Sequence, residues 1–218
     1  FLGSGGNVVD EEYIEHHKTV NVMEPEFYDG KDNTTWIWQK PITDHEYILS
    51  SDVSRGDGDD WSTFTIIDFT TMEQVVEYRG KIPPDKLGEL LDEYGRLYGN
   101  ALMIIDITGG MGVTTALKVQ ELRYPNLYYE ERSKPLKSRK DEGKYFEKNE
   151  APGFQVGADR SRLVSQFEKM IRINVDEGID KGIKVRSSRL ITEMNTFIYK
   201  NGRADHATGK HDDLIMAM

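Results

Sequence analysis

The sequence predicts an α/β fold in which helices flank a mixed β-sheet. Three segments rich in β-branched and aromatic residues follow one another between residues 46 and 79, and their short connections favour an antiparallel meander. A helical apolar pattern then leads into a continuous apolar run at 101–105, and a second helical pattern follows that run. This order requires the antiparallel meander on one side of the sheet and parallel β-α-β crossovers on the other.

The meander is expected to contain three strands. Residues 47–52 form the first strand and run into a turn rich in glycine and aspartate. Residues 63–69 form the second strand, and residues 73–79 form the third after a short turn at Thr70-Thr71.

The crossover part of the sheet is expected to follow. A helix begins at Pro83-Pro84, where proline suits the first turn, and ends before Gly99-Asn100. Residues 101–106 are predicted to be a buried central strand covered on both faces. A helix over 113–122 and a fifth strand at 127–130 complete this part.

The remaining segments alternate between loops and short elements. They are a basic loop or hairpin over 132–158, a helix capped by Asp159 or Ser161, a short edge strand at 183–185, a helix capped by Ser187 or Ser188, a hairpin turn at 199–203, and a last helix that begins near His211.

Residues 1–45 are predicted to be an irregular linker, and residues 46–218 the folded domain. Glycine and proline punctuate the first segment, in which Trp36 and Trp38 are expected to pack onto the domain. Because the chain starts at Phe1 and stops inside an apolar helical pattern at Met218, we expect it to be part of a longer polypeptide.

Composition limits the kinds of site that the chain can form. The chain contains no cysteine, so disulfides and thiolate metal sites are excluded and any metal must bind to carboxylates, histidines or water. No signal segment and no run of about twenty apolar residues is present, which predicts a soluble intracellular protein. The formal net charge of −10 is unusual for a protein that binds nucleic acid. Bound cations and tethering to DNA by a partner would each compensate for it.

Acidic side chains stand at three positions that core packing does not explain. Asp52 ends an apolar strand, Asp106 ends the most apolar strand, and Asp212-Asp213 begins an apolar helix. Strand ends of α/β sheets are where binding sites collect, and carboxylates without cysteine or histidine clusters suit Mg²⁺ or Mn²⁺. Two such ions about 4 Å apart can hold a phosphodiester for hydrolysis. Taken singly, each acid also fits a turn or a helix cap.

The combination of these segments resembles a known family, the nuclease domain of the large terminase subunit of tailed bacteriophages, within the RNase H/RuvC-like superfamily and closest to its myovirus branch. The matching segments are residues 47–60 (YILSSDVSRGDGDD), 103–106 (MIID) and 211–217 (HDDLIMA). Residues 1–4 (FLGS) are similar to the family's junction after its ATPase domain. The resemblance spans essentially the whole chain and implies an RNase H-like fold.

The resemblance also implies roles for the acids. Asp52 would bridge two metal ions, and Asp106 would be the second catalytic acid, at a position where the family often has glutamate. The third catalytic acid would be Asp212 or Asp213. The side chains of neighbouring helical residues point about 100° apart, so one of the two should coordinate the metal and the other should support it. We favour Asp213 as the metal ligand. Asp60 matches an auxiliary acid of the family.

Basic residues near these acids are candidates for DNA contacts. His211 fits a cap or a phosphate contact better than a general base. The DNA-binding candidates are Arg55, Lys134, Lys137, Arg139, Lys140 and His211. For the basic residues of the 132–158 segment, a solvated loop is an equally good interpretation.

The function that the resemblance implies is metal-dependent endonucleolytic cutting of concatemeric double-stranded DNA, without sequence preference, during viral DNA packaging. The partners would be an ATPase domain of the same polypeptide, the portal and the small terminase subunit, in the host bacterial cytoplasm at the procapsid portal; no membrane is involved. Two alternatives remain open: another RNase H-like nuclease, such as a Holliday-junction resolvase or transposase, and a non-enzymatic acidic interaction module.

Overall fold

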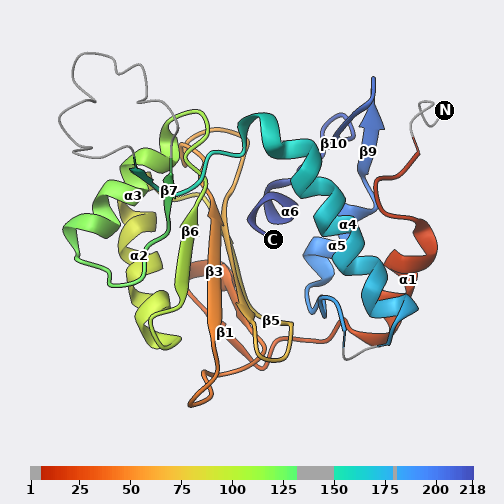
Figure 1. Cartoon of the computed structure of the whole chain (residues 1–218), viewed down its shortest axis with the longest axis horizontal. Coiled ribbons are helices and arrows are strands. Elements are labelled where there is room, and N and C mark those ends of the chain that lie inside the picture. Colours follow the sequence, from red (N-terminus) through yellow and green to blue (C-terminus); the bar gives the residue numbers. More distant parts are fainter. Residues whose placement is uncertain (1–5, 132–149, 179–180) are drawn as a thin grey trace.

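A six-stranded mixed sheet forms the centre of the computed structural model, which describes residues 6–131, 150–178 and 181–218. The strand order is β1-β2-β5-β4-β3-β6, and every pair is antiparallel except β3 and β6. Helices cover both faces of the sheet (Figure 1). The strands of this sheet are β1 (Phe27–Asp29), β2 (Thr35–Ile37), β3 (Tyr47–Asp52), β4 (Ser62–Asp68), β5 (Glu73–Gly80) and β6 (Leu102–Ile105).

The predicted meander is confirmed as β3, β4 and β5. Tyr47 pairs with Asp68 and Asp52 pairs with Thr63, so the first two strands are in register over their whole length. The third strand pairs with β4 from Ser62 to Asp68, with one irregularity between Ile66 and Ile67. Strand β6 pairs in parallel with the edge of β3 that faces away from β4.

The prediction for the apolar strand at 101–106 is wrong in one respect. Strand β6 is the last strand in the sheet order, and among the described residues only isolated bridges, to Leu127 and Phe154, lie beyond it. Met103 and Ile105 are fully buried, whereas Ile104 points to the opposite face and lines a cavity of about 310 Å³. An apolar run does not distinguish a central strand from a strand at the end of a sheet.

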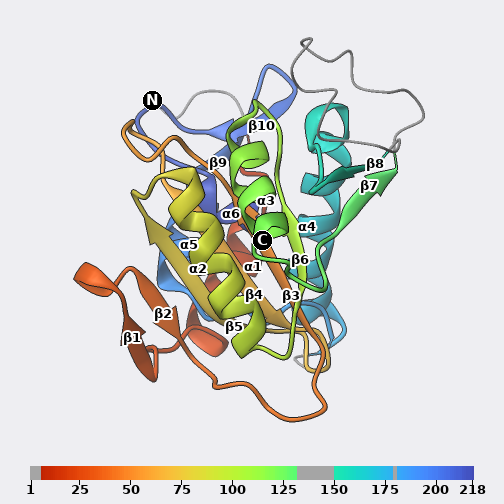
Figure 2. The same cartoon turned by 90° about the vertical axis from the view of Figure 1, so that its left-hand side faces the viewer.

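One helical layer consists of α2 (Pro84–Leu97) and α3 (Met111–Glu121), which lie in front of the sheet in Figure 2. Leu87 and Leu91 of α2 are fully buried. The two predicted helices of this region are therefore confirmed. The predicted fifth strand is present only as β7 (Tyr129–Glu131), which pairs with β8 (Glu150–Pro152) in a separate small sheet.

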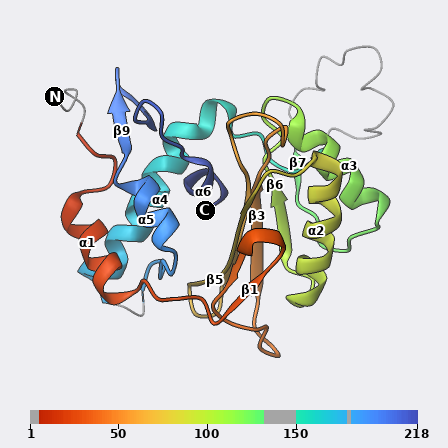
Figure 3. The same ribbon diagram turned by 180° about the vertical axis from the view of Figure 1, so that it is seen from behind.

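The other layer contains the C-terminal helices and α1, as Figure 3 shows from behind. Ser187 caps α5 by accepting hydrogen bonds from the backbone amides of Arg189 and Leu190, and Asn201 lies in the predicted hairpin turn. The predicted edge strand is a single bridge between Glu73 and Lys184. The remaining elements are α4 (Arg160–Asp176), α5 (Ser188–Met194), β9 (Phe197–Lys200), β10 (Arg203–His206), α6 (Asp213–Ala217), and the 3₁₀ turns η1 (Lys31–Asn33) and η3 (Gly157–Asp159).

Residues 6–45 are not irregular, contrary to the prediction. Helix α1 (Glu11–Val20) buries Ile14 and His17, and the His17 ring is 3.0 Å from the carbonyl oxygen of Ile171 in α4. Strands β1 and β2 extend the sheet beyond β5. Trp38 is buried and Trp36 packs under the Arg189 guanidinium, so the expectation that both tryptophans pack onto the domain is confirmed.

Within the described ranges, no helix has both the length and the apolar content that a membrane span requires.

Candidate metal centre

Asp52 and Asp106 lie side by side at the carboxyl edge of the sheet. Asp52 is the last residue of β3, and Asp106 follows the last residue of β6. The two strands are parallel with Ser51 opposite Ile105, and the Asp106 amide donates a 2.9 Å hydrogen bond to the Ser51 carbonyl. Parallel pairing therefore brings together two acids that are separated by more than fifty residues in the sequence.

The glycine turn after Asp106 fixes this acid against a helix. The Thr108 amide donates a 2.8 Å hydrogen bond to Asp106 Oδ1. A Cβ atom on Gly112 would lie 1.8 Å from the Asp106 carbonyl oxygen, so only glycine lets α3 begin this close to the strand end. Gly112 therefore serves close helix–strand packing, whereas Gly109 and Gly110 have open space around them and adopt positive φ angles of 75° and 95° in the turn.

Asp213 reaches the same edge from α6. The Thr63 hydroxyl donates a 2.8 Å hydrogen bond to the Asp213 carbonyl, and Thr63 is the residue paired with Asp52 in the sheet. The Trp61 amide lies 3.3 Å from Asp213 Oδ2, to which it donates, and Asp213 is buried. The first residue of α6 is thus held over the end of β4, next to Asp52.

The pKa values indicate that the three carboxylates interact. Burial, followed by the charges of Asp106, Asp213 and Asp212, raises the pKa of Asp52 to about 8. Burial also raises the pKa of Asp213 to about 6, and the Trp61 amide opposes this increase. Like charges gathered in a partly buried position disfavour ionisation unless a cation neutralises them. The donor set consists of carboxylate oxygens, which hard divalent cations prefer.

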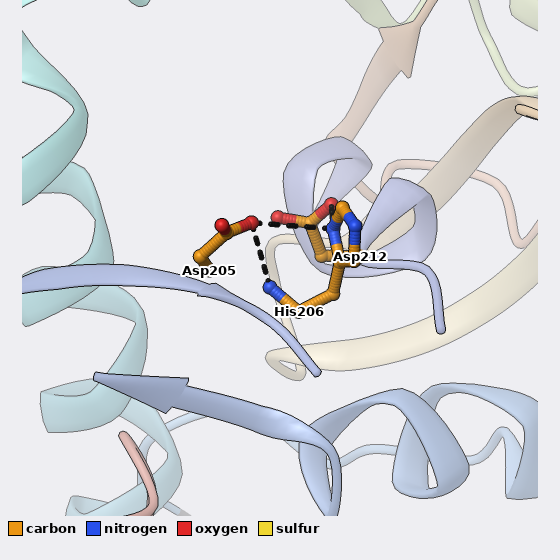
Figure 4. A group of neighbouring side chains, drawn as sticks. All are labelled: Asp205, His206 and Asp212. Carbon is orange, nitrogen blue, oxygen red and sulfur yellow. Dashed lines mark hydrogen bonds and ion pairs between the residues drawn. The ribbon is translucent and has the colours of Figure 1, made fainter. Parts of the chain in front are cut away.

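Asp212 faces a different set of partners from Asp213. Its Oδ2 lies 2.5 Å from the Arg160 guanidinium, and its Oδ1 lies 3.1 Å from His206 Nδ1. Asp205 joins the group, so that ligand-type atoms of Asp205, His206 and Asp212 all lie within 4.8 Å of one another (Figure 4). The positive charge of Arg160 already neutralises Asp212. We therefore interpret Asp205, His206 and Asp212 as residues that hold the start of α6 in place and not as a cation site.

Glu193 is a further acid beside the centre, and the sequence analysis missed it. It is buried, and its Oε2 accepts hydrogen bonds from the amides of Leu214 (2.9 Å) and Ile215 (3.3 Å). Burial, followed by the charge of Asp213, raises the pKa of Glu193 to about 8. The sequence does contain a signal for this residue, because Glu193 is an acid that stands between Ile191 and Met194 on the apolar face of a predicted helix.

The loop between β3 and β4 contains two of the remaining candidates, Arg55 and Asp60. His211 Nδ1 lies 4.0 Å from Asp60 and 3.5 Å from Asp213, so the structure brings Asp60 to the rim of the centre. Arg55 pairs with Asp57 at 3.0 Å, and both side chains are largely exposed. Four predicted DNA contacts lie outside the described residues: Lys134, Lys137, Arg139 and Lys140.

The comparisons with known proteins show the fold. No protein-family model matches the sequence, and no curated protein sequence matches it at a significant level. The structure is similar to the large terminase nuclease of the thermophilic phage G20c with bound cobalt, at 17% identity, covering 94% of this chain and 93% of that chain with a TM-score of 0.63. The same nuclease with bound magnesium gives 17% identity, the same coverage and a TM-score of 0.62.

A second phage protein gives the same result. The large terminase nuclease domain of Thermus phage P74-26 is 14% identical, and the match covers 94% of this chain and 90% of that chain with a TM-score of 0.58. These matches extend over at least nine tenths of each chain, so the overall fold is shared, in agreement with the predicted resemblance. The chain therefore has the RNase H-like α/β fold of phage large terminase nuclease domains.

Proposed function

We propose that this chain is a metal-dependent DNA endonuclease domain of a viral DNA-packaging terminase. The observation that carries the proposal is the convergence of Asp52, Asp106 and Asp213 at one edge of a sheet that has the terminase nuclease fold. The similar G20c nuclease has been crystallised with magnesium and with cobalt, which supports a divalent cation here. The cation is proposed to be Mg²⁺ or Mn²⁺, as two ions.

The order of the strands suggests how the acids would divide the ligation. Asp52 lies between Asp106, which follows the neighbouring strand β6, and Asp213, which lies over the other neighbouring strand, β4. Asp52 would therefore contact both metal ions, and Asp106 and Asp213 would each bind one of them. Asp60, at the rim, would be an auxiliary ligand. Bound ions of this kind activate water and stabilise charge on a phosphodiester. His211 would contact a phosphate near Asp213.

The biological setting is part of the same proposal. The domain would cut concatemeric double-stranded DNA without reading its sequence, and an ATPase domain of the same polypeptide would be one of its partners. In this setting the portal and the small terminase subunit would be its partners, in the host cytoplasm at the procapsid. DNA held by these partners would need few cations on the domain itself.

Plasmid cleavage tests the proposal directly. The chain is incubated with supercoiled plasmids of unrelated sequence in the presence of Mg²⁺, Mn²⁺ or EDTA, beside the variants Asp52→Asn and Asp106→Ala. We expect nicking and linearisation that require metal and that both substitutions abolish, while circular dichroism shows an intact fold.

The same experiment separates the alternatives. Strong preference for four-way junctions or for defined DNA ends would favour a resolvase or a transposase. A folded chain that neither cuts DNA nor gains thermal stability from Mg²⁺ or Mn²⁺ would support an acidic interaction module. An Asp52→Asn variant that cuts at the wild-type rate would refute the assignment of the centre.

A further inference from the structure

A tryptophan with two cations beside it borders the candidate metal centre. The Arg79 guanidinium lies 5.3 Å from the centre of the Trp61 ring, and the Lys81 ammonium lies 5.0 Å from it. Trp61 is also the residue whose amide donates to Asp213. We call Trp61, Arg79 and Lys81 the Trp61 patch.

The sheet register places the patch on the same face as the acids. Asp52 pairs with Thr63, and Thr63 pairs with Arg79, so the three side chains point to one side of the sheet. Lys81 follows the last residue of β5, and its ammonium lies over the same Trp61 ring as Arg79. The Thr63 hydroxyl bonds to the Asp213 carbonyl, so this is the side on which α6 lies. Two strand spacings separate Arg79 from Asp52, which amounts to roughly 10 Å.

The charges of the patch are not neutralised by neighbouring acids. Arg189 pairs with Glu77 and Arg55 pairs with Asp57. By contrast, neither Arg79 nor Lys81 forms an ion pair within residues 6–131, 150–178 and 181–218. In a chain with 38 acidic and 28 basic residues, two such cations over one aromatic ring are available to an external anion.

We propose that the Trp61 patch binds backbone phosphates of the DNA next to the scissile phosphate. This inference rests on the proposed nuclease function and specifies how that site holds its substrate. Each strand of duplex DNA carries one phosphate per about 3.4 Å of helix axis, so roughly 10 Å corresponds to about three nucleotides. Contacts to phosphates position the duplex without reading bases, which suits a sequence-tolerant nuclease.

A salt titration of DNA binding tests the patch. The Asp52→Asn variant serves as the background so that the DNA is not cut, and a fluorescent duplex of arbitrary sequence is the probe. The double substitution Arg79→Gln and Lys81→Gln is compared with the background by fluorescence anisotropy between about 50 and 200 mM salt.

The expected result is a lower affinity and a weaker salt dependence. Each lost phosphate contact should reduce the slope of log K against log salt by about 0.9, which is about eightfold in affinity at 0.1 M salt. The double variant should therefore bind roughly 60-fold more weakly, with a slope smaller by about 1.8. Lys81→Gln alone removes the positive charge of an exposed side chain, so the fold should persist and the slope should change by about half as much.

Arg123→Gln is the matched control. Arg123 is exposed and forms no ion pair within the part of the chain that the structure describes. It follows α3, an 11-residue helix that begins at Met111 close to the Asp106 carbonyl, so it lies about 16 Å further along the helix axis. Its substitution removes one positive charge far from the centre. We expect its affinity and slope to equal those of the background.

The outcomes for the patch and for the nuclease can be separated. The proposal for the Trp61 patch would be overturned if the double variant and the background had equal slopes of log K against log salt. It would also be overturned if the background did not bind DNA at about 50 mM salt. A wild-type chain that cuts plasmid, combined with unchanged slopes, leaves the nuclease proposal intact and rejects only the patch. A folded wild-type chain that neither cuts plasmid nor gains thermal stability from Mg²⁺ or Mn²⁺, combined with a reduced slope in the double variant, rejects the nuclease and retains only the binding of DNA phosphates by the patch.

Discussion

Replacing Asp52 with asparagine is expected to stabilise the metal-free protein as well as abolish cleavage. Burial and the nearby charges of Asp106, Asp213 and Asp212 raise the pKa of Asp52 to about 8. Below the ordinary carboxyl pKa of 3.8, Asp52 is protonated in both the folded and the unfolded chain, and it does not affect the free energy of unfolding. As the pH rises towards 8, the unfolded chain loses this proton while the folded chain keeps it, so stability decreases.

The size of this loss of stability follows from the pH range between the two pKa values of Asp52, 3.8 in the unfolded chain and about 8 in the folded chain. At pH 7 the solution is about 3 pH units above the ordinary pKa, and each unit corresponds to about 1.4 kcal/mol. The wild-type protein should therefore lose up to about 4 kcal/mol of stability between pH 4 and pH 7 that an asparagine variant does not lose. Active sites commonly reduce stability in this way, because function requires like charges at one place.

Urea unfolding with EDTA, followed by circular dichroism across this pH range, measures the difference. The free energy of unfolding of the Asp52→Asn variant should match the wild type near pH 4 and exceed it increasingly towards pH 7. Mg²⁺ at about 100 times its Kd should raise the wild-type value by about 2.7 kcal/mol and have little effect on the variant. A constant difference between the two proteins at all pH values would refute the electrostatic argument.

Two further predictions concern α6 and its support. Glu193→Ala should destabilise the fold by about 1–3 kcal/mol, because it leaves the buried amides of Leu214 and Ile215 without a hydrogen-bond acceptor. Glu193→Gln keeps an acceptor oxygen and should retain most of that stability. Thermal unfolding of both variants measures the difference. Asp213→Asn should abolish the increase in melting temperature caused by Mg²⁺, whereas Asp212→Asn should only weaken it, because Asp212 contacts Arg160 and His206. Equal responses of these two variants to Mg²⁺ would contradict the division of roles.

Local patterns were sufficient to predict the elements that hold the acids. The strands that end at Asp52 and near Asp106 have β-branched and apolar runs bounded by turns, and the meander has connections too short for other arrangements. The helical divergence of adjacent residues predicted that Asp212 and Asp213 would differ in role. Asp212 is the N-cap of α6 with a non-helical backbone, and it pairs with Arg160, whereas Asp213 accepts a hydrogen bond from the Trp61 amide. The contacts of the two acids differ, and their roles in metal binding stay a prediction.

The elements that were missed depend on tertiary pairing. Strands β1 and β2 have three residues each, which is too short for an alternating pattern, and β2 is defined by its pairing with Tyr78, Glu77 and Val76 of β5. Helix α1 has a moderate apolar face whose partner, α4, lies about 150 residues away in the sequence. Propensity alone does not indicate such contacts.

The acidic composition illustrates a similar limit of the sequence. A net charge of −10 argues against DNA binding only if the charges are spread evenly over the surface. The register instead aligns acids and cations on one face, with Asp52 and Arg79 two strands apart and no acid paired with Arg79 among the described residues. Local charge next to the reacting phosphate, rather than net charge, determines whether a strand of DNA can be held there. The Trp61 patch is therefore where the objection raised by the composition can be tested.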